Sequence, residues 1–225
     1  MNLAVVTGAA GALGSAVLDD LIGRGWTVAA FDRPGERLDK AGERDGVVPV
    51  PVDLLDRSSV RAAWEQVDAV GTPTALVALA GAFRSSSLTD LDEDLLGAMW
   101  STNVVALLWC CQGAAPRMAS AGGGSIVTVG SRSAVSGSAP VAYGASKAAV
   151  VRATEVLADE LRPQKIRVNC VLPSVIDSPA NRSWMSPELA ARAVPPSAIA
   201  PVIAFLLGPE SAPVSGARIP VYGDA

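Results

Sequence analysis

The most constraining feature of the sequence is an apolar run that ends in a glycine-rich turn near residue 1. Leu3 to Val6 is fully apolar, which is typical of a strand buried on both faces of a parallel sheet. The turn Thr7–Gly14 follows, and then a segment with apolar residues at helical spacing. Glycines let a backbone approach a phosphate closely, and a helix N-terminus adds N–H groups and a positive dipole end. The turn therefore predicts a dinucleotide cradle built from Gly8, Gly11, Ala12, Leu13 and Gly14, although turns of small residues also serve simple strand–helix packing.

Further apolar runs alternate with helical segments along the chain. This alternation predicts an α/β fold, a Rossmann-like doubly wound parallel sheet flanked by helices in three αβα layers. With 225 residues, half of them hydrophobic, the chain can bury one core, so we expect a single domain over residues 1–225. Pro220 predicts that the last strand lies at a sheet edge. The expected strands are Leu3–Val6, Trp26–Phe31, Val47–Val52, Ala75–Leu79, Ser125–Val129, Ile166–Leu172 and Arg218–Val221.

Acidic residues follow the second and third expected strands. Asp32, about twenty residues past the turn, can accept both ribose hydroxyls of an adenosine and would repel a 2′-phosphate. Arg33, directly after it, could instead accommodate that phosphate. We therefore expect NAD as the cofactor, with NADP as the alternative. Asp53, followed by Leu54, could meet the adenine amino group, or it could cap the helix that starts near Ser58.

Tyr143 and Lys147 stand four residues apart, which places both side chains on one face of a helix. A free phenol has a pKa of about 10 and is a poor proton shuttle at neutral pH. A neighbouring ammonium favours the phenolate and would lower that pKa. The pair therefore predicts a proton donor or acceptor at a carbonyl or hydroxyl oxygen.

Composition excludes several other functions. No histidine is present, which argues against Ser-His hydrolases and most transition-metal sites, so we expect no metal. The net charge is −4, without a long basic run, so we expect no nucleic-acid partner. Three cysteines without a CxxC pair suit a cytoplasmic protein and buried apolar positions. Neither a signal peptide nor a membrane span is expected.

With these residues in place, the chain resembles a short-chain dehydrogenase/reductase over essentially its full length. No single motif carries the resemblance, but their order along the chain is specific. The matching pieces are Thr7–Gly14, Asp32, Asp53-Leu54, Ala80-Gly81, Asn103, Gly124–Val127 leading to Ser131, Tyr143-x-x-x-Lys147, and Arg167–Asn169 leading to Pro173.

The resemblance implies a role for each of these positions. Tyr143 would be the general acid/base, and Lys147 would lower its pKa and hold the nicotinamide ribose. Ser131 would hydrogen-bond the substrate oxygen, and Asn103 would help to hold a water behind Lys147. The cofactor would also contact Ala80, Gly81, Pro173, Ser174, Ile176 and Ser178, with the backbone of Ile176 facing the carboxamide.

The sequence departs from the family pattern in two places. The usual Asn-Asn-Ala-Gly is Ala78-Leu79-Ala80-Gly81 here, and the usual slot for the serine falls on Gly130, which leaves Ser133 as an alternative to Ser131. The first of these departures, together with residues 11–15 and 177–182, is similar to quinonoid dihydropteridine reductases.

The second half of the chain is expected to supply a lid and an assembly surface. Residues 178–196, with four prolines, predict a loop with short helical pieces, on which Trp184 and Met185 would line the substrate pocket together with Ser131 and Ser133. The long segments Leu95–Met118 and Tyr143–Leu161 resemble the helices that form the family's dimer interface, so we expect a homodimer or homotetramer.

These observations predict an NAD(P)-dependent oxidoreductase that moves hydride between the nicotinamide and a carbonyl or secondary alcohol of a small molecule. One alternative is reduction of a quinonoid pterin or similar imine, for which the serine would matter less. A second alternative, from another functional class, is a catalytically silent protein that senses dinucleotides.

Overall fold

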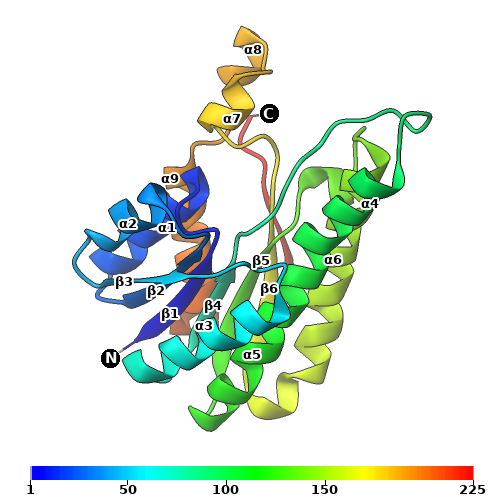
Figure 1. Cartoon of the computed structure of the whole chain (residues 1–225). Coiled ribbons are helices and arrows are strands. Elements are labelled where there is room, and N and C mark those ends of the chain that lie inside the picture. Colours follow the sequence, from blue (N-terminus) through cyan, green and yellow to red (C-terminus); the bar gives the residue numbers. More distant parts are fainter. Residues whose placement is uncertain (1, 225) are drawn as a thin grey trace.

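A seven-stranded parallel sheet forms the centre of the computed structural model, which describes residues 2–224 (Figure 1). The strand order is β3-β2-β1-β4-β5-β6-β7, and every neighbouring pair is parallel. All seven expected strands are present, and their ends lie within one residue of the predicted ones. The strands are β1 (Leu3–Thr7), β2 (Thr27–Asp32), β3 (Val47–Pro51), β4 (Ala75–Ala78), β5 (Gly124–Val129), β6 (Ile166–Pro173) and β7 (Arg218–Val221).

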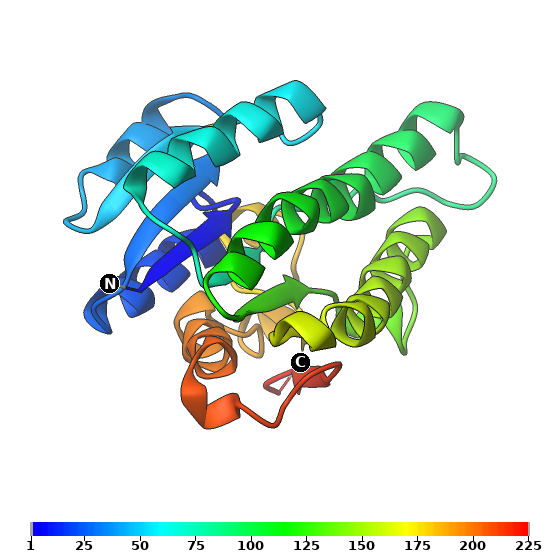
Figure 2. The same ribbon diagram turned by 90° about the horizontal axis from the view of Figure 1, so that it is seen from below.

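Helices cover both faces of the sheet (Figure 2). One face packs against α3 (Arg57–Val70), α5 (Ala106–Ser120) and α6 (Val141–Glu160). The other face packs against α1 (Ala12–Gly23), α2 (Glu36–Gly42) and α9 (Pro196–Leu207). The predicted three-layer fold is therefore confirmed. The central strands are buried on both faces, which explains why they read as continuous apolar runs rather than as alternating patterns.

The direction of winding reverses at β1, which lies between β2 and β4. In an open parallel sheet, the carboxyl ends of the strands on either side of such a reversal frame a crevice. The glycine-rich turn Thr7–Gly14 begins at this point. The topology therefore places the predicted cradle at the edge where ligands bind in such sheets.

The helix from Glu93 to Ser120 contains an irregular turn in its middle. It begins as α4 (Glu93–Trp100), passes through a π-helical turn at Ser101–Val105, and continues as α5. Over the described residues, it is the one helix long and apolar enough by composition to cross a membrane, with a hydropathy of 1.3 in its best window. The prediction that no segment would qualify is therefore wrong on this criterion. The α5 part packs against the sheet, as a core helix does.

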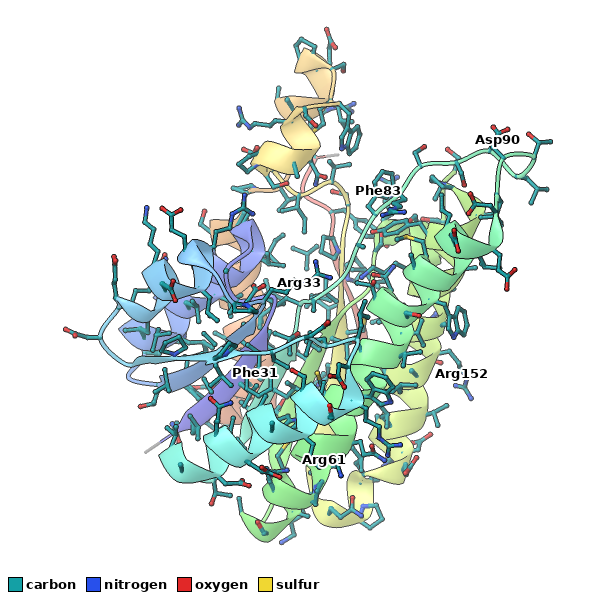
Figure 3. All side chains as sticks on the ribbon, viewed as in Figure 1. Phe31, Arg33, Arg61, Phe83, Asp90 and Arg152 are labelled. Carbon is teal, nitrogen blue, oxygen red and sulfur yellow. The ribbon has the colours of Figure 1, made fainter. Side chains whose placement is uncertain are left out.

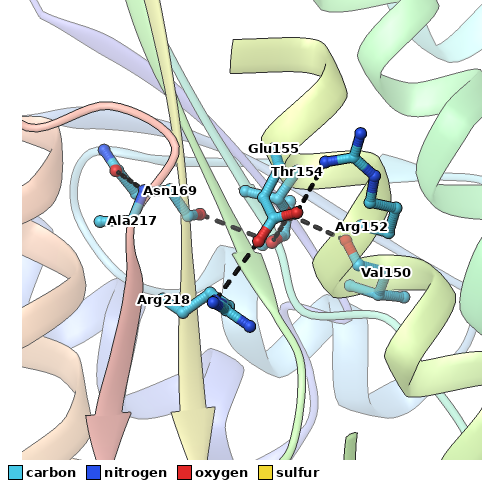
Figure 4. A network of polar contacts seen from close by, with 8 residues as sticks. Val150, Arg152, Thr154, Glu155, Asn169, Ala217 and Arg218 are labelled. Atoms are coloured by element: carbon cyan, nitrogen blue, oxygen red, sulfur yellow. Dashed lines mark hydrogen bonds and ion pairs between the residues drawn. The ribbon is translucent and has the colours of Figure 1, made fainter. Parts of the chain in front are cut away.

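A polar network fastens the edge strand β7, whose position confirms the expectation from Pro220 (Figure 4). On α6, Glu155 binds Arg152 at 2.8 Å and Arg218 of β7 at 3.3 Å. On β6, the Asn169 side chain accepts a hydrogen bond from the Ala217 N–H, at 3.0 Å. These contacts tie β7 to α6 and β6, although only one of its sides is paired with another strand.

Candidate functional site

A cavity of about 560 Å³ lies at the carboxyl edge of the sheet, where the winding reverses. The turn after β1, the end of β2, the segment after β4 and the segment after β6 contribute its walls. Of the residues predicted to bind the cofactor, the structure places these in the wall: Gly8, Gly11, Ala12, Leu13, Gly14, Asp32, Arg33, Ala80, Gly81, Ile176 and Ser178.

The glycine-rich turn is shaped by close backbone contacts. Gly8 adopts a φ of +65°, and a Cβ at Gly14 would lie 2.3 Å from the Gly8 carbonyl oxygen. A side chain at position 14 would therefore force α1 away from the turn. Helix α1 begins after Gly11, whose lack of a side chain leaves the N-terminus of the helix without a side-chain cap. The first N–H groups of α1 thus remain available at the cavity wall, which is the arrangement that binds phosphate at a helix N-terminus.

Asp32 is fixed at the end of β2 by two backbone hydrogen bonds. Its Oδ2 accepts from the Ala10 N–H and its Oδ1 accepts from the Arg33 N–H, both at 2.8 Å. The carboxylate therefore joins the end of β2 to the phosphate turn and lines the same cavity. Arg33 and Arg37 also line it. Arg37 was not among the predicted contacts, although a second arginine four residues after Arg33 could have indicated another cation at the cofactor site.

Six of the predicted cofactor contacts do not line the cavity: Asp53, Leu54, Tyr143, Lys147, Pro173 and Ser174. Asp53 accepts from the Leu55 N–H at 2.9 Å, and Leu54 lies beside it. The alternative reading of Asp53 as a helix cap is wrong, because α3 begins at Arg57 and Asp56 caps it through the Ser58 N–H. Two more lie elsewhere: Pro173 is the last residue of β6, and Ser174 donates to the Tyr222 carbonyl.

Lys147 is buried on α6, and its Nζ donates to the Val129 carbonyl at the end of β5, at 2.8 Å. A Cβ at Gly81 would lie 3.2 Å from this Nζ. The missing side chain of Gly81 therefore lets the ammonium reach the cavity wall. Burial lowers the pKa of Lys147 to about 8.

Tyr143 lies one turn before Lys147 on α6 and is only partly exposed. Burial raises the pKa of its phenol, and a hydrogen bond with Ser131 opposes that rise. The prediction that Lys147 lowers this pKa is wrong for this structure. The buried ammonium donates to Val129, and burial rather than this charge sets the direction of the shift in the phenol pKa. The phenol therefore holds its proton at neutral pH.

Ser131 lies immediately after β5 and is buried. Its Oγ lies 2.8 Å from the Oγ of Ser133, so the two predicted serines are brought together. Ser131 is the one that hydrogen-bonds Tyr143. A side chain at Gly130 would lie 2.6 Å from Leu172, which explains why a serine cannot occupy that slot.

Asn103 lies in the π-helical turn and is buried. Its Oδ1 accepts from the Ala82 N–H at 2.8 Å, and its Nδ2 donates to Ser146 at 2.9 Å. Asn103 thus fastens the segment after β4 to α6, beside Lys147. Widened turns of this kind are frequent at functional sites.

The segment after β6 rises above the cavity as two short helices, α7 (Pro179–Arg182) and α8 (Pro187–Ala190), as expected for residues 178–196 (Figure 1). Ser178 and Ser186 cap them. A parallel β-bridge between Ile176 and Val194 joins the two ends of this segment. The Ile176 carbonyl accepts from Asn181, at 2.9 Å.

Phe83 is a site residue that the sequence analysis missed. It lies on the extended segment between β4 and α4 (Figure 3). Its ring meets Tyr143 edge-on, with centroids 5.0 Å apart, and it stacks on Trp184 at 6.1 Å. An isolated aromatic residue in a polar stretch, two residues after Gly81, was the signal that could have found it. Trp184 thus lies next to Tyr143's neighbour Phe83, and the lining of a substrate pocket by Trp184 and Met185 stays a prediction.

Taken together, these residues can transfer a proton beside the cavity. A protonated phenol, a serine hydroxyl and a buried ammonium occupy neighbouring positions, with aromatic side chains over them. Within residues 2–224, no cluster of three or more His, Cys, Asp or Glu side chains could hold a metal.

Known proteins match the chain over nearly its whole length. The family model described as short chain dehydrogenase matches residues 2–189. D-threitol dehydrogenase of Mycolicibacterium smegmatis is 31% identical, over 99% of this chain and 92% of the relative. A variant of actinorhodin polyketide ketoreductase, solved with NADPH, has a TM-score of 0.92 and 27% identity, covering 99% of this chain and 96% of its own. A 3-oxoacyl-[acyl-carrier protein] reductase from Brucella melitensis, solved with NAD, has a TM-score of 0.89 and 26% identity, covering 99% and 90%.

Proposed function

The chain belongs to the short-chain dehydrogenase/reductase family, and from this membership we propose that Tyr143 is the general acid/base of its reaction. The protein is an NAD(P)-dependent oxidoreductase that acts on a carbonyl or alcohol group of a small molecule. The observation that carries the assignment to Tyr143 is its place on α6, one turn before the buried Lys147, with Ser131 acting on the pKa of its phenol.

The residues of the cavity suit a nicotinamide dinucleotide. The uncapped N-terminus of α1 would hold the pyrophosphate, and Asp32 would accept hydrogen bonds from the adenosine ribose. Lys147 would hold the other ribose through the N–H groups that Val129 does not use. Ile176 and Ser178 would lie beside the nicotinamide. Pro173 and Ser174, at the end of β6, would also contact the cofactor. When bound, the nicotinamide supplies or accepts the hydride.

The chain's own residues then handle the proton. In reduction, the Tyr143 hydroxyl donates its proton to the carbonyl oxygen, so that hydride and proton together give the alcohol. Ser131 donates a hydrogen bond to the same oxygen and polarises the carbonyl. The phenol is protonated at neutral pH, which is the state that a proton donor in reduction needs. Asn103 holds the segment after β4 in place beside Lys147.

For the cofactor, we propose NAD rather than NADP. Asp32 is fixed by two backbone N–H groups and would oppose a 2′-phosphate. Two cations support the alternative, because Arg33 and Arg37 line the same cavity. Among the solved relatives, one holds NAD and another holds NADPH.

We also propose a homodimer or homotetramer in the cytoplasm. Large apolar side chains remain 40–46% exposed on the outer faces of the two long helical segments, which supports an interface there. These are Leu96, Trp100, Leu108 and Val156. The three cysteines are free and buried, which suits a reducing compartment. Residues 178–196 would act as the lid of this single domain.

The test of the catalytic role is the oxidation of NADH and NADPH with a set of aldehydes, ketones and quinonoid pterins. Turnover that needs Tyr143 supports the proposal for carbonyl substrates. Turnover restricted to a pterin or imine would favour the pterin-reductase alternative. Cofactor binding without turnover of any acceptor would favour the dinucleotide sensor.

A further inference from the structure

Three aromatic rings from three separate segments meet above the proposed proton donor. Tyr143 comes from α6, Phe83 from the segment after β4, and Trp184 from the segment after α7. The Phe83 ring stands at 80° to Tyr143, and it lies within 23° of parallel to Trp184. Both arrangements are favourable aromatic contacts, so the three rings form one continuous apolar surface.

This surface remains open although its members contact each other. Phe83 is 47% exposed and Trp184 is 51% exposed. Two other large apolar residues are also exposed in this part of the chain: Val135 between β5 and α6, and Val141 at the start of α6, each 45% exposed. Burying such surface against an apolar ligand is favourable in water.

Three arginines are close in sequence to these segments: Arg84, directly after Phe83, is exposed, whereas the other two contact neighbouring groups. On the lid, Arg182 binds Asp177 beside the Trp184 segment. On the β5–α6 loop, the Arg132 guanidinium lies 5.2 Å from the centre of the Tyr222 ring. A polyhydroxylated substrate needs many hydrogen-bonding groups, whereas the surface that Phe83 and Trp184 form beside Tyr143 is aromatic.

We propose that the substrate is a carbonyl compound, or the matching secondary alcohol, that carries an aromatic ring next to the reacting carbon. The ring packs against Phe83 and Trp184 while the oxygen meets Tyr143 and Ser131. This substrate class differs from the sugar alcohol in the name of the Mycolicibacterium relative. The inference rests on the proposed role of Tyr143 as the general acid/base.

Steady-state reduction of three probe ketones tests the inference: acetophenone, acetone and the four-carbon ketose erythrulose. We expect kcat/KM for acetophenone to exceed that for erythrulose by at least about tenfold. Apolar contacts in a pocket usually change kcat/KM by about this factor. Phe83→Ala and Trp184→Ala should each lower kcat/KM for acetophenone about tenfold more than they lower kcat/KM for acetone, mainly through KM. Phe205→Ala is the matched control, because Phe205 is also 47% exposed but lies on α9.

A preference for erythrulose, or equal losses for acetone and acetophenone in both variants, would overturn the aromatic subsite and leave the proposed function intact. If no ketone is reduced, the proposed function fails, and fluorescence then decides the subsite separately. Saturable quenching by 1-phenylethanol that disappears in Trp184→Phe and weakens in Phe83→Ala would uphold it. Absence of such quenching in the wild type would refute it.

Discussion

The Nζ of Lys147 donates a 2.8 Å hydrogen bond to the carbonyl oxygen of Val129, which joins α6 to the end of β5. The contact holds an ammonium in a buried position, and burial brings its pKa down to about 8. The charge that would hold a ribose and stabilise a phenolate is therefore one that titrates just above neutral pH.

The first prediction is the loss of cofactor capture as the pH rises through about 8. Below this value Lys147 is an ammonium, and above it the neutral amine loses its attraction for ribose oxygens. The pH profile of kcat/KM for the cofactor measures this, because it reports ionisations of the free enzyme. Lys147→Met should remove the falling limb and reduce both kcat and cofactor affinity. A wild-type profile that stays flat to pH 10 would contradict the assignment.

The second prediction concerns Tyr143. Tyr143→Phe should reduce kcat by roughly 10²–10⁴, the usual contribution of a positioned acid. Binding of the cofactor should be nearly unchanged, since the phenol acts at the chemical step and lies outside the cavity wall. Stopped-flow turnover and fluorescence titration separate the two effects. Near wild-type turnover would refute the mechanism, although the fold would not be affected.

The third prediction separates the two serines. Ser131→Ala should lower kcat for a carbonyl substrate by about tenfold or more, because Ser131 hydrogen-bonds Tyr143. Ser133→Ala should have a smaller effect, since Ser133 contacts the site through Ser131. Comparison of kcat for the two variants on one ketone is the measurement. The opposite order would move the role to Ser133, and a small effect of both would favour the pterin-like alternative.

The fourth prediction concerns the choice of cofactor. The wild type should bind NADH more tightly than NADPH, and Asp32→Ala should narrow or reverse the difference. Asp32 also fixes the turn through the Ala10 N–H, so a general loss of affinity is expected as well. Titration of NADH and of NADPH into the wild type, Asp32→Ala, Arg33→Ala and Arg37→Ala gives the ratio of the two dissociation constants for each protein. A wild-type preference for NADPH would show that the arginines dominate.

The fifth prediction concerns assembly. Light scattering at micromolar concentration should give the mass of a dimer or tetramer. Trp100→Glu should shift that mass toward the monomer, because it places a charge on the exposed apolar face of α4. Leu55→Glu is the control, since Leu55 is 41% exposed but precedes α3. A monomeric wild type at concentrations where the enzyme is active would disprove the interface.

The sequence by itself determined the strands, their order of appearance and the class of fold. Buried parallel strands such as Ala75–Ala78 are continuous apolar runs, and the turn glycines mark where backbone must meet backbone; both are local signals. The spacing of Tyr143 and Lys147 also specified one helix face without any knowledge of the fold.

Only the tertiary structure decided which distant residues share the site. Phe83 and Trp184 are a hundred residues apart in the chain, so no local pattern could indicate that their rings stack over Tyr143. The same is true of pKa values, because burial and hydrogen bonding from other elements set them. The spacing of Tyr143 and Lys147 predicted a lowered pKa for Tyr143. In the structure, burial raises this pKa, and the Lys147 ammonium donates to the Val129 carbonyl. Periodicity reports which face of an element is apolar, but solvation of a group depends on everything packed around it.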